Sequence, residues 1–256
     1  LHRLWHASGS GGSFFAGTDL IVALSVSWIP LCADYTRFAT SRRAGFWGAG
    51  LGYLLPTLFQ FGFGAVLVLS HPSIQGPADI LTTVAAGGVA SFLALLALTV
   101  DETDEAFANV YSAAVSIQNL APRLPQRALI VACSVLATAG ALAFDLTQYA
   151  QFLYLLGAFF VPLFGVLLAD WLRRGRHYSR ADIFDGPVFR PGMIGAWLAG
   201  FFFYEWLAQT PGLGFWTEFF GRLHPLPVQI GASVPSFALA FALAWLVGLS
   251  ARRAAV

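Results

Sequence analysis

The stretch LALTVDETDEAF, residues 97–108, places four carboxylates within five positions of an otherwise apolar part of the chain. The apolar residues GGVASFLALLAL precede the acidic positions, and FANVYSAAVSI follows them. Read as one helix over 86–119, this region would be about 50 Å long, against a hydrocarbon core of about 30 Å. The carboxylates would then lie near the middle of a membrane. The alternative is two helices with DETDE in an external loop, for which GVASFLALLAL is a short span.

The composition of the whole chain is that of a membrane protein. Of its 256 residues, 57% are hydrophobic and 11% are charged, whereas a soluble domain carries roughly 25% charged residues. The net charge of +1 provides no basic surface for nucleic acid. We therefore expect an all-α polytopic membrane protein that contacts the lipid bilayer and has no nucleic-acid partner.

The apolar segments predict seven transmembrane helices, because a spanning helix needs about 20 largely apolar residues. The segments are 18–36, 45–70, 86–119, 128–144, 147–172, 193–209 and 232–250. A short helix is expected over 78–87. The loop 210–231 holds aromatic residues and prolines, which suits a membrane interface.

Arginine residues fall mostly on one side of the predicted membrane. Arg3 and Arg222 lie on one side, and the other twelve arginines on the opposite side are Arg37, Arg42, Arg43, Arg123, Arg127, Arg173, Arg174, Arg176, Arg180, Arg190, Arg252 and Arg253. Because positively charged loops stay in the cytoplasm, we expect residue 1 outside a cell membrane and residue 256 inside. A start outside without a signal peptide predicts a longer protein, with an odd number of spans before residue 1.

The first span, DLIVALSVSWIPLCADYTRF over 19–38, has the features of an interrupted helix. Pro30 lacks a backbone donor and disfavours helical geometry in the preceding residue. Ser25 and Ser27 stand just before it and can stabilise an irregular turn. Interrupted backbone in a membrane needs protein or a wet cavity around it, and in secondary transporters it binds substrate. The segment is either such a discontinuous helix or a proline-kinked helix without a ligand role.

Charged residues at three places near span ends suggest interfacial roles. Asp34 and Arg37 are three residues apart and can pair on one helix face, which would fix the helix end, with gating as the alternative. Asp170 is expected to pair with Arg173. Glu205 is expected at the membrane interface.

Helical spacing sorts the acids of the third span. Asp101, Glu105 and Asn109 form one row at intervals of four residues, with Asp104 beside it. A charge at mid-membrane costs at least ~2.5 kcal/mol, so several acids must face protein, water or a cation, and some must hold protons. The row favours a cation or proton site with substrate hydrogen bonding nearby.

Three stretches carry a family resemblance: SWIPLCADYTRFA, DETDEAFANVYSAAVSIQN and FFVPLFGVLLADW. In this order and spacing they resemble the nucleobase:cation symporter-1 family, and within it the branch of hydroxymethylpyrimidine transporters associated with thiamin precursor uptake. The resemblance runs over nearly the whole chain. It implies twelve spans on the five-plus-five inverted-repeat fold of sodium-coupled amino-acid symporters, with spans six to twelve in this chain and spans one to five before residue 1.

The same resemblance implies an organisation into four parts. Residues 1–17 would be an extracytoplasmic loop, and 18–172 would be the second inverted repeat with spans six to ten. Residues 173–192 would be a cytoplasmic loop. Residues 193–256 would hold the two additional spans, eleven and twelve.

The resemblance also implies a substrate site between spans one, three, six and eight in the family's numbering. Spans six and eight are the first and third spans of this chain. Span six would contribute Ser25, Ser27 and Trp28. In a hydantoin-transporting relative, a tryptophan stacks on the substrate near the position of Ser25, whereas here the tryptophan stands three residues later. Span eight would contribute Asn109, which hydrogen-bonds the heterocycle, and Glu105, where the pattern has another asparagine.

The resemblance assigns the site of the coupling ion to positions next to the substrate residues. The sodium-binding hydroxyl pair of that relative falls on Thr103 and Asp104, with Asp101 one turn further out. Thr103 keeps the hydroxyl, but Asp104 supplies a carboxylate that can ligate sodium or carry a proton. The resemblance therefore implies Na⁺ or H⁺ coupling and no other cofactor. All five histidines lie in predicted loops, so no transition-metal site is expected.

Two groups of residues are expected to support or gate this site. Pro30, Asp34 and Arg37 belong to the interrupted span. A further group lies near the outer end of span ten, a helix that can act as an outer gate in this fold; its members are Gln148, Tyr149 and Gln151. The alternative for the second group is an interfacial cluster of aromatic and amide side chains.

Together these observations predict a secondary transporter that imports a small planar heterocycle by Na⁺ or H⁺ symport with alternating access. Hydroxymethylpyrimidine is the first expectation, and another pyrimidine or a nucleobase is the next. The protein is not expected to be an enzyme. One alternative is an integral-membrane enzyme using the carboxylates, but no nucleophile or metal ligand accompanies them. Another is a non-transporting membrane subunit.

Overall fold

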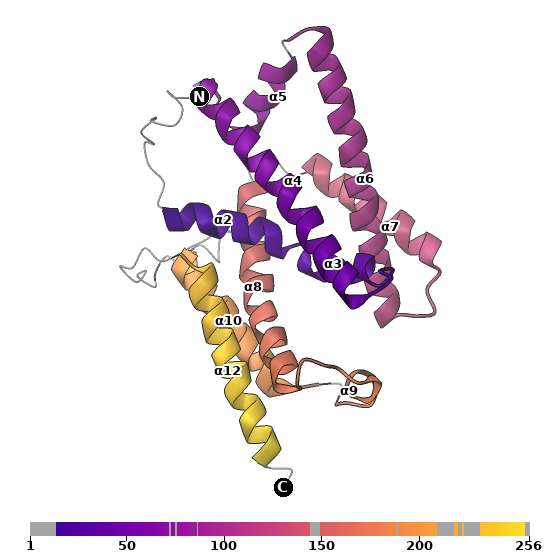
Figure 1. Ribbon diagram of the computed structural model, residues 1–256, viewed down its shortest axis with the longest axis vertical. Helices are drawn as coiled ribbons and strands as arrows, with labels where there is room; N and C mark the ends of the chain where they lie inside the picture. Colours follow the sequence, from indigo (N-terminus) through magenta and orange to yellow (C-terminus); the bar gives the residue numbers. More distant parts are fainter. Residues whose placement is uncertain are drawn as a thin grey trace. The chain divides into compact units, whose positions relative to one another are not determined.

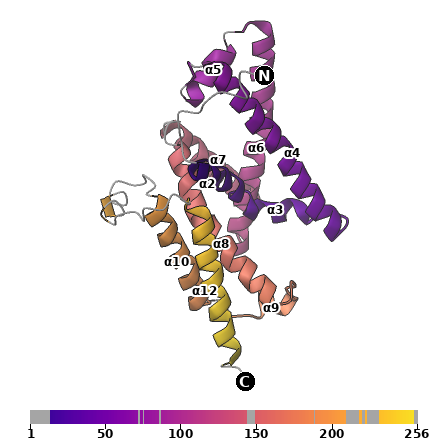
Figure 2. The same cartoon turned by 60° about the vertical axis from the view of Figure 1, so that its left-hand side comes forward.

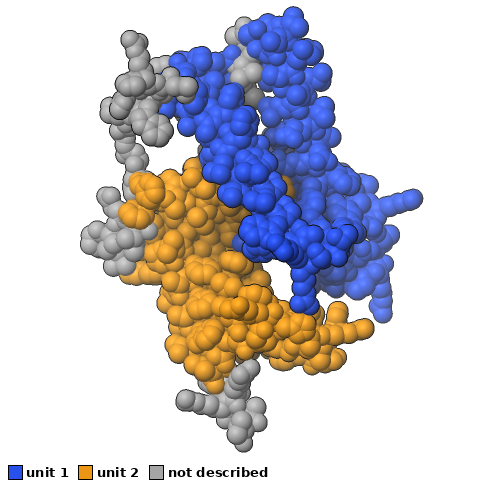
Figure 3. Space-filling view, viewed as in Figure 1, with its two compact units in different colours: residues 1–9, 29–149 blue, residues 10–28, 150–256 orange. Residues whose placement is uncertain are grey.

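The computed structural model describes residues 14–71, 73–74, 76–85, 87–143, 149–187, 189–208, 218–219, 222 and 231–253. In these ranges every regular element is a helix (Figure 1). The chain divides into two compact units, coloured separately in Figure 3. Unit 1 comprises residues 1–9 and 29–149, and unit 2 comprises residues 10–28 and 150–256.

Each segment predicted to span the membrane contains helix. The first span is split into α2 (Phe14–Val26) and α3 (Ile29–Thr36). The other predicted spans correspond to α4 (Arg42–Ser70), α6 (Val89–Leu120), α7 (Gln126–Ala143), α8 (Tyr149–Arg173), α10 (Pro191–Ala208) and α12 (Ser233–Arg253). The expected short helix is α5 (Pro77–Ala85). The prediction of an all-helical polytopic membrane protein is thus confirmed.

Four segments in the described part are long and apolar enough to cross a membrane: Gly17–Thr36, Arg42–Ser70, Gln126–Ala143 and Phe152–Arg173. The apolar part of α12, Ser233–Leu249, is a little shorter. The helix α6 has the length but carries the four acids. The count of seven spans and the inverted repeat therefore stay predictions.

In unit 1 the acidic segment lies inside one continuous helix. No glycine or proline occurs between Val89 and Leu120, so nothing in the sequence breaks the helix. It begins after Gly88, whose positive φ of 77° suits glycine, and it ends just before Pro122. The alternative with DETDE in a loop is therefore wrong. The helices α3, α5 and α7 all contact α6.

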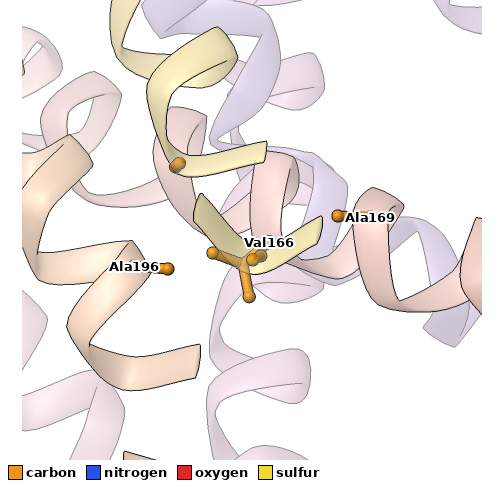
Figure 4. Packing of buried hydrophobic residues seen from close by; sticks show 5 residues of the cluster. Val166, Ala169 and Ala196 are labelled. Atoms are coloured by element: carbon orange, nitrogen blue, oxygen red, sulfur yellow. The ribbon is translucent and has the colours of Figure 1, made fainter. Parts of the chain in front are cut away.

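Unit 2 is held together by small residues where α8, α10 and α12 meet. Its core is a cluster of mostly alanine side chains (Figure 4), made by Val166, Ala169, Ala196, Ala240 and Ala244. A Cβ on Gly200 of α10 would lie 2.6 Å from Pro162 Cβ and 2.8 Å from Ala240 Cβ. Small residues allow such close approach of membrane helices. In both cartoon views α10 and α12 lie side by side (Figures 1 and 2).

A carboxylate joins α2 to the beginning of α12 within unit 2. Asp19, only 8% exposed, accepts hydrogen bonds from the backbone N–H groups of Ala232 (2.5 Å) and Ser233 (2.9 Å). These groups have no partner within a helix, and a negative charge at a helix N-terminus is favourable. The sequence reading did not identify this contact.

The connection between α8 and α10 contains the short helix α9 (Arg180–Phe184). Ser179 and Asp182 form a capping box at its start, in which each accepts a hydrogen bond from the backbone N–H of the other. The Ser179 hydroxyl also donates to the Asp182 carboxylate, and these bonds lower the pKa of Asp182 below its ordinary value.

The carboxylate of Asp170 has partners other than the predicted Arg173. It accepts hydrogen bonds from Arg174 (3.0 Å), Arg190 (3.2 Å) and the hydroxyl of Tyr178 (3.0 Å). Burial, with the nearby Asp170 charge, raises the pKa of Tyr178 to about 12. Arg173 donates instead to backbone carbonyls of α12.

Glu205 is buried by protein within unit 2. It is 1% exposed within α10, beside Tyr204 at 0%, and its position at the membrane interface stays a prediction. The helix is apolar on all sides, so its sequence pattern does not identify the face that packs inward.

Candidate functional site

The interruption of the first span lies at Ser27 and Trp28. The helix α2 ends at Val26 and α3 begins at Ile29. The hydroxyl of Ser27 donates to the carbonyl of Leu24 at 2.7 Å, which satisfies one of the last carbonyls of α2. The predicted discontinuous helix is therefore present, and its role with a ligand stays a prediction.

Pro30 explains where the second half begins. It is the second residue of α3, in the first turn, where its missing N–H would have no helical partner in any case. The turn is closed by a bond from the Trp28 N–H to the Ser25 carbonyl at 3.3 Å. Sequence placed the break correctly because the proline and the preceding serines act locally.

The boundary between the two units falls at the same place, between Trp28 and Ile29. Ser25, Ser27 and Trp28 consequently belong to unit 2, whereas Glu105 and Asn109 belong to unit 1.

The acidic segment of α6 is exposed within unit 1. The exposed side chains are Asp101, Glu102, Thr103, Asp104, Glu105 and Asn109. The Thr103 hydroxyl donates to the Thr99 carbonyl of its own helix at 2.7 Å. Its oxygen lone pairs remain able to accept or to ligate. The carboxylates of this segment are thus available to a substrate, a cation or further protein.

The half-helix α3 packs against the acid-bearing face of α6. Asp34 accepts a hydrogen bond from the Ser112 hydroxyl. Ser112 stands seven residues after Glu105, which is close to two full turns, so both side chains lie on one face. The hydrogen bond therefore places α3 on the face that carries Glu105.

A second contact continues the row of Asp104. Arg37 donates to the Tyr111 hydroxyl at 2.9 Å, and Tyr111 stands seven residues after Asp104. The phenol of Tyr35 also lies within electrostatic range of Asp104 and Glu105. The predicted pair of Asp34 with Arg37 is replaced by these contacts to α6. Ser112 and Tyr111 were missed by sequence reasoning, and their spacing from the acids is the signal that could have found them.

Two other expectations have different outcomes. In the ranges that the structure describes, no three His, Cys, Asp or Glu side chains gather as a metal site. Of the predicted gate residues, Gln148 lies outside the described residues. Tyr149 and Gln151 belong to the first turn of α8, but their side chains also lie outside the described part.

Comparison with protein families now adds to this geometry. The sequence model of a family described as permeases for cytosine/purines, uracil, thiamine and allantoin matches residues 2–186. The match covers more than half of the chain and includes both halves of the interrupted helix and all of α6. Comparisons with curated proteins and with solved structures returned no match. The chain therefore belongs to the family of permeases for cytosine/purines, uracil, thiamine and allantoin.

Proposed function

We propose that this chain forms part of a secondary transporter that imports a small planar heterocycle by Na⁺ or H⁺ symport with alternating access. Hydroxymethylpyrimidine is the first candidate substrate, followed by other pyrimidines and nucleobases. The observation that carries the proposal is the packing of α3, the second half of an interrupted helix, on the face of α6 that holds the acids. Interrupted helices form the substrate and ion sites of many secondary transporters.

The substrate role is assigned to residues on both helices. The amide of Asn109 both donates and accepts, which matches the alternating ring nitrogens and exocyclic groups of a pyrimidine. Glu105, one turn away, adds an acceptor or, when protonated, a donor. Ser25, Ser27 and Trp28 would complete the site from the interruption, where the tryptophan ring offers a stacking surface for a planar ligand.

The cation role is assigned to Asp104, Thr103 and Asp101. A hard cation such as Na⁺ is bound by oxygen ligands, which carboxylate and hydroxyl groups supply. A proton needs only one carboxylate whose charged form is costly at mid-membrane. Both ions therefore suit this segment, and the two are separable by experiment.

The site is proposed to be completed by other spans of the same protein. The resemblance implies a substrate between four spans, two of which would belong to this chain. The acid-bearing face of α6 is exposed in unit 1, which leaves room for those partners.

The test is uptake of labelled pyrimidine by the full-length protein in proteoliposomes, with each gradient imposed alone. A sodium gradient at equal pH and a pH gradient without sodium distinguish the two coupling ions. We expect saturable uptake that depends on one gradient and falls in Asp104→Asn. The matched control is Asp185→Asn, an exposed carboxylate beyond α9. Uptake that depends on neither the sodium gradient nor the pH gradient would overturn the symport proposal.

A further inference from the structure

Two hydroxyl groups are buried in unit 2 without a hydrogen-bond partner among the residues that the structure describes. They are Tyr204 Oη on α10 and Ser233 Oγ at the start of α12. The two residues are 0% and 1% exposed, respectively. A hydroxyl buried in this way is costly unless a donor or an acceptor meets it, so the two groups point to a bound partner.

Both hydroxyls lie beside the carboxylate of Asp19 on α2. The Ser233 backbone N–H donates to Asp19 at 2.9 Å, and the Tyr204 phenol lies within electrostatic range of the same carboxylate. Ala23 stands one turn after Asp19. A Cβ on Gly157 would meet both Ala23 Cβ (2.8 Å) and Tyr204 Oη (2.9 Å), so the phenol hydroxyl lies against this face of α2. Polar groups from α2, α10 and α12 thus converge inside unit 2.

The partner of the two hydroxyls must be small and must both donate and accept. The Ser233 side chain is close enough to interact with Tyr204, yet neither hydroxyl has the geometry of a direct hydrogen bond. Asp19 accepts from the backbone N–H groups of Ala232 and Ser233, and a carboxylate offers about four acceptor positions. A group between them can therefore accept from a hydroxyl and donate to the carboxylate.

Water meets these requirements better than a cation does. A buried water typically makes about three hydrogen bonds to polar groups, and three groups converge here. A cation would lie at the N-terminus of α12, which is the positive end of the helix dipole. We propose that one buried water molecule binds between Asp19, Tyr204 and Ser233 and joins α2 to α10 and α12.

The bridge would fix the first half of the interrupted helix. Asp19 lies in the middle of α2, which ends at Val26, directly before Ser27 and Trp28. A water that holds Asp19 against α10 and α12 would therefore help to position the predicted substrate residues at the break. This consequence rests on the proposed function, whereas the water site itself does not.

The direct test is a cryo-EM map of the full-length protein at a resolution that shows ordered water. We expect density for one water at hydrogen-bond distance, about 2.5–3.2 Å, from Tyr204 Oη, Ser233 Oγ and the Asp19 carboxylate. A direct hydrogen bond between the two hydroxyls, or a protein atom in place of the water, would overturn the proposal. The map needs no variant and no uptake measurement, so the water site and the transport proposal can fail separately.

Variants of the full-length protein test the bridge by thermal unfolding. Tyr204→Phe and Ser233→Ala each remove one hydroxyl, and each should lower the unfolding temperature by about 2 °C. Because both hydroxyls bond the same water, the double variant should lose little more than either single variant. A Tyr204→Phe variant that is more stable than the wild type would show an unpartnered hydroxyl and would overturn the proposal.

The matched control is Ser236→Ala, on the same face of α12. Ser236 is 0% exposed, but its hydroxyl donates to the carbonyls of Ala232 (2.7 Å) and Ser233 (3.0 Å) of its own helix. Its loss should therefore add to that of Tyr204→Phe. Additive losses in the pair of Tyr204 and Ser233 would contradict a shared water. A stabilisation by Na⁺ that Tyr204→Phe abolishes would show a cation site and would also overturn the proposal.

Discussion

The guanidinium of Arg37 donates a 2.9 Å hydrogen bond to the hydroxyl of Tyr111, which lies 74 residues further along the chain. The neighbouring Ser112 donates to Asp34. These two bonds attach the half-helix after the interruption to the helix that bears the acids. Any movement of α3 during transport would therefore also act on the face of α6 that carries Asp104 and Glu105.

Removing the Asp34–Ser112 bond should weaken this attachment. Hydrogen bonds to charged groups contribute about 1.5–3 kcal/mol, so we expect Asp34→Ala or Ser112→Ala to lower the thermal stability and the uptake rate of the full-length protein. The double variant should lose little more than either single variant, because all three remove one contact. Thermal unfolding and uptake measure both effects.

A matched control for the serine variant is Thr138→Ala. Its hydroxyl donates only to the Ser134 carbonyl of the same helix, at 2.8 Å, so its loss should have little effect. Additive losses in the double variant, or equal losses in Ser112→Ala and Thr138→Ala, would show that the contact does not couple the two helices.

Asp19 should stabilise the start of α12. It accepts from two backbone N–H groups while buried, and loss of a capping side chain costs roughly 0.5–2 kcal/mol. We expect Asp19→Ala to lower the unfolding temperature, whereas the exposed Asp185→Ala should not. An unchanged midpoint in Asp19→Ala would mean that the cap contributes nothing to stability.

Gly200 should tolerate no side chain. An added Cβ would meet Pro162 Cβ at 2.6 Å and Ala240 Cβ at 2.8 Å, and overpacking costs typically about 1–3 kcal/mol. We expect Gly200→Ala to be destabilised, with Gly195→Ala as the control on the same helix, where an added Cβ meets nothing within 4 Å. Thermal unfolding of both variants is the measurement, and equal stability of the two would contradict the packing described for unit 2.

Tyr178 should stay protonated well above the ordinary phenol range. Its pKa is raised from 10.0 to about 12 by burial and by the Asp170 charge. Between these values the unfolded chain loses this proton while the folded chain keeps it, so the contribution of Tyr178 to stability is complete below pH 10 and falls as pH rises toward 12. Phenolate absorbance is measured against pH for the wild type and for Tyr178→Phe. The difference between the two curves reports Tyr178 and should titrate near pH 12. A difference that titrates near pH 10 would contradict the part-buried contact with Asp170.

Local structure was predictable from the sequence, whereas the tertiary partners of individual side chains were not. Pro30 and the serines before it identify the break, and the absence of glycine and proline in α6 is sufficient for its continuity. Spacing within one helix suggested that Asp34 pairs with Arg37, but spacing carries no information on the helix that packs alongside. The burial of Glu205 was not predictable, because an all-apolar helix has no pattern that marks its buried face.

The central claim is that α6 presents Asn109 to a transported heterocycle. The most direct test compares saturable uptake of labelled pyrimidine by full-length wild type, Asn109→Ala and Asn119→Ala in proteoliposomes. Asn119 is an exposed asparagine near the end of the same helix, so it controls for loss of an amide. We predict that Asn109→Ala loses uptake by about tenfold or more, as expected for a lost ligand hydrogen bond, and that Asn119→Ala does not. Saturable uptake at the wild-type rate and affinity in Asn109→Ala would contradict the claim.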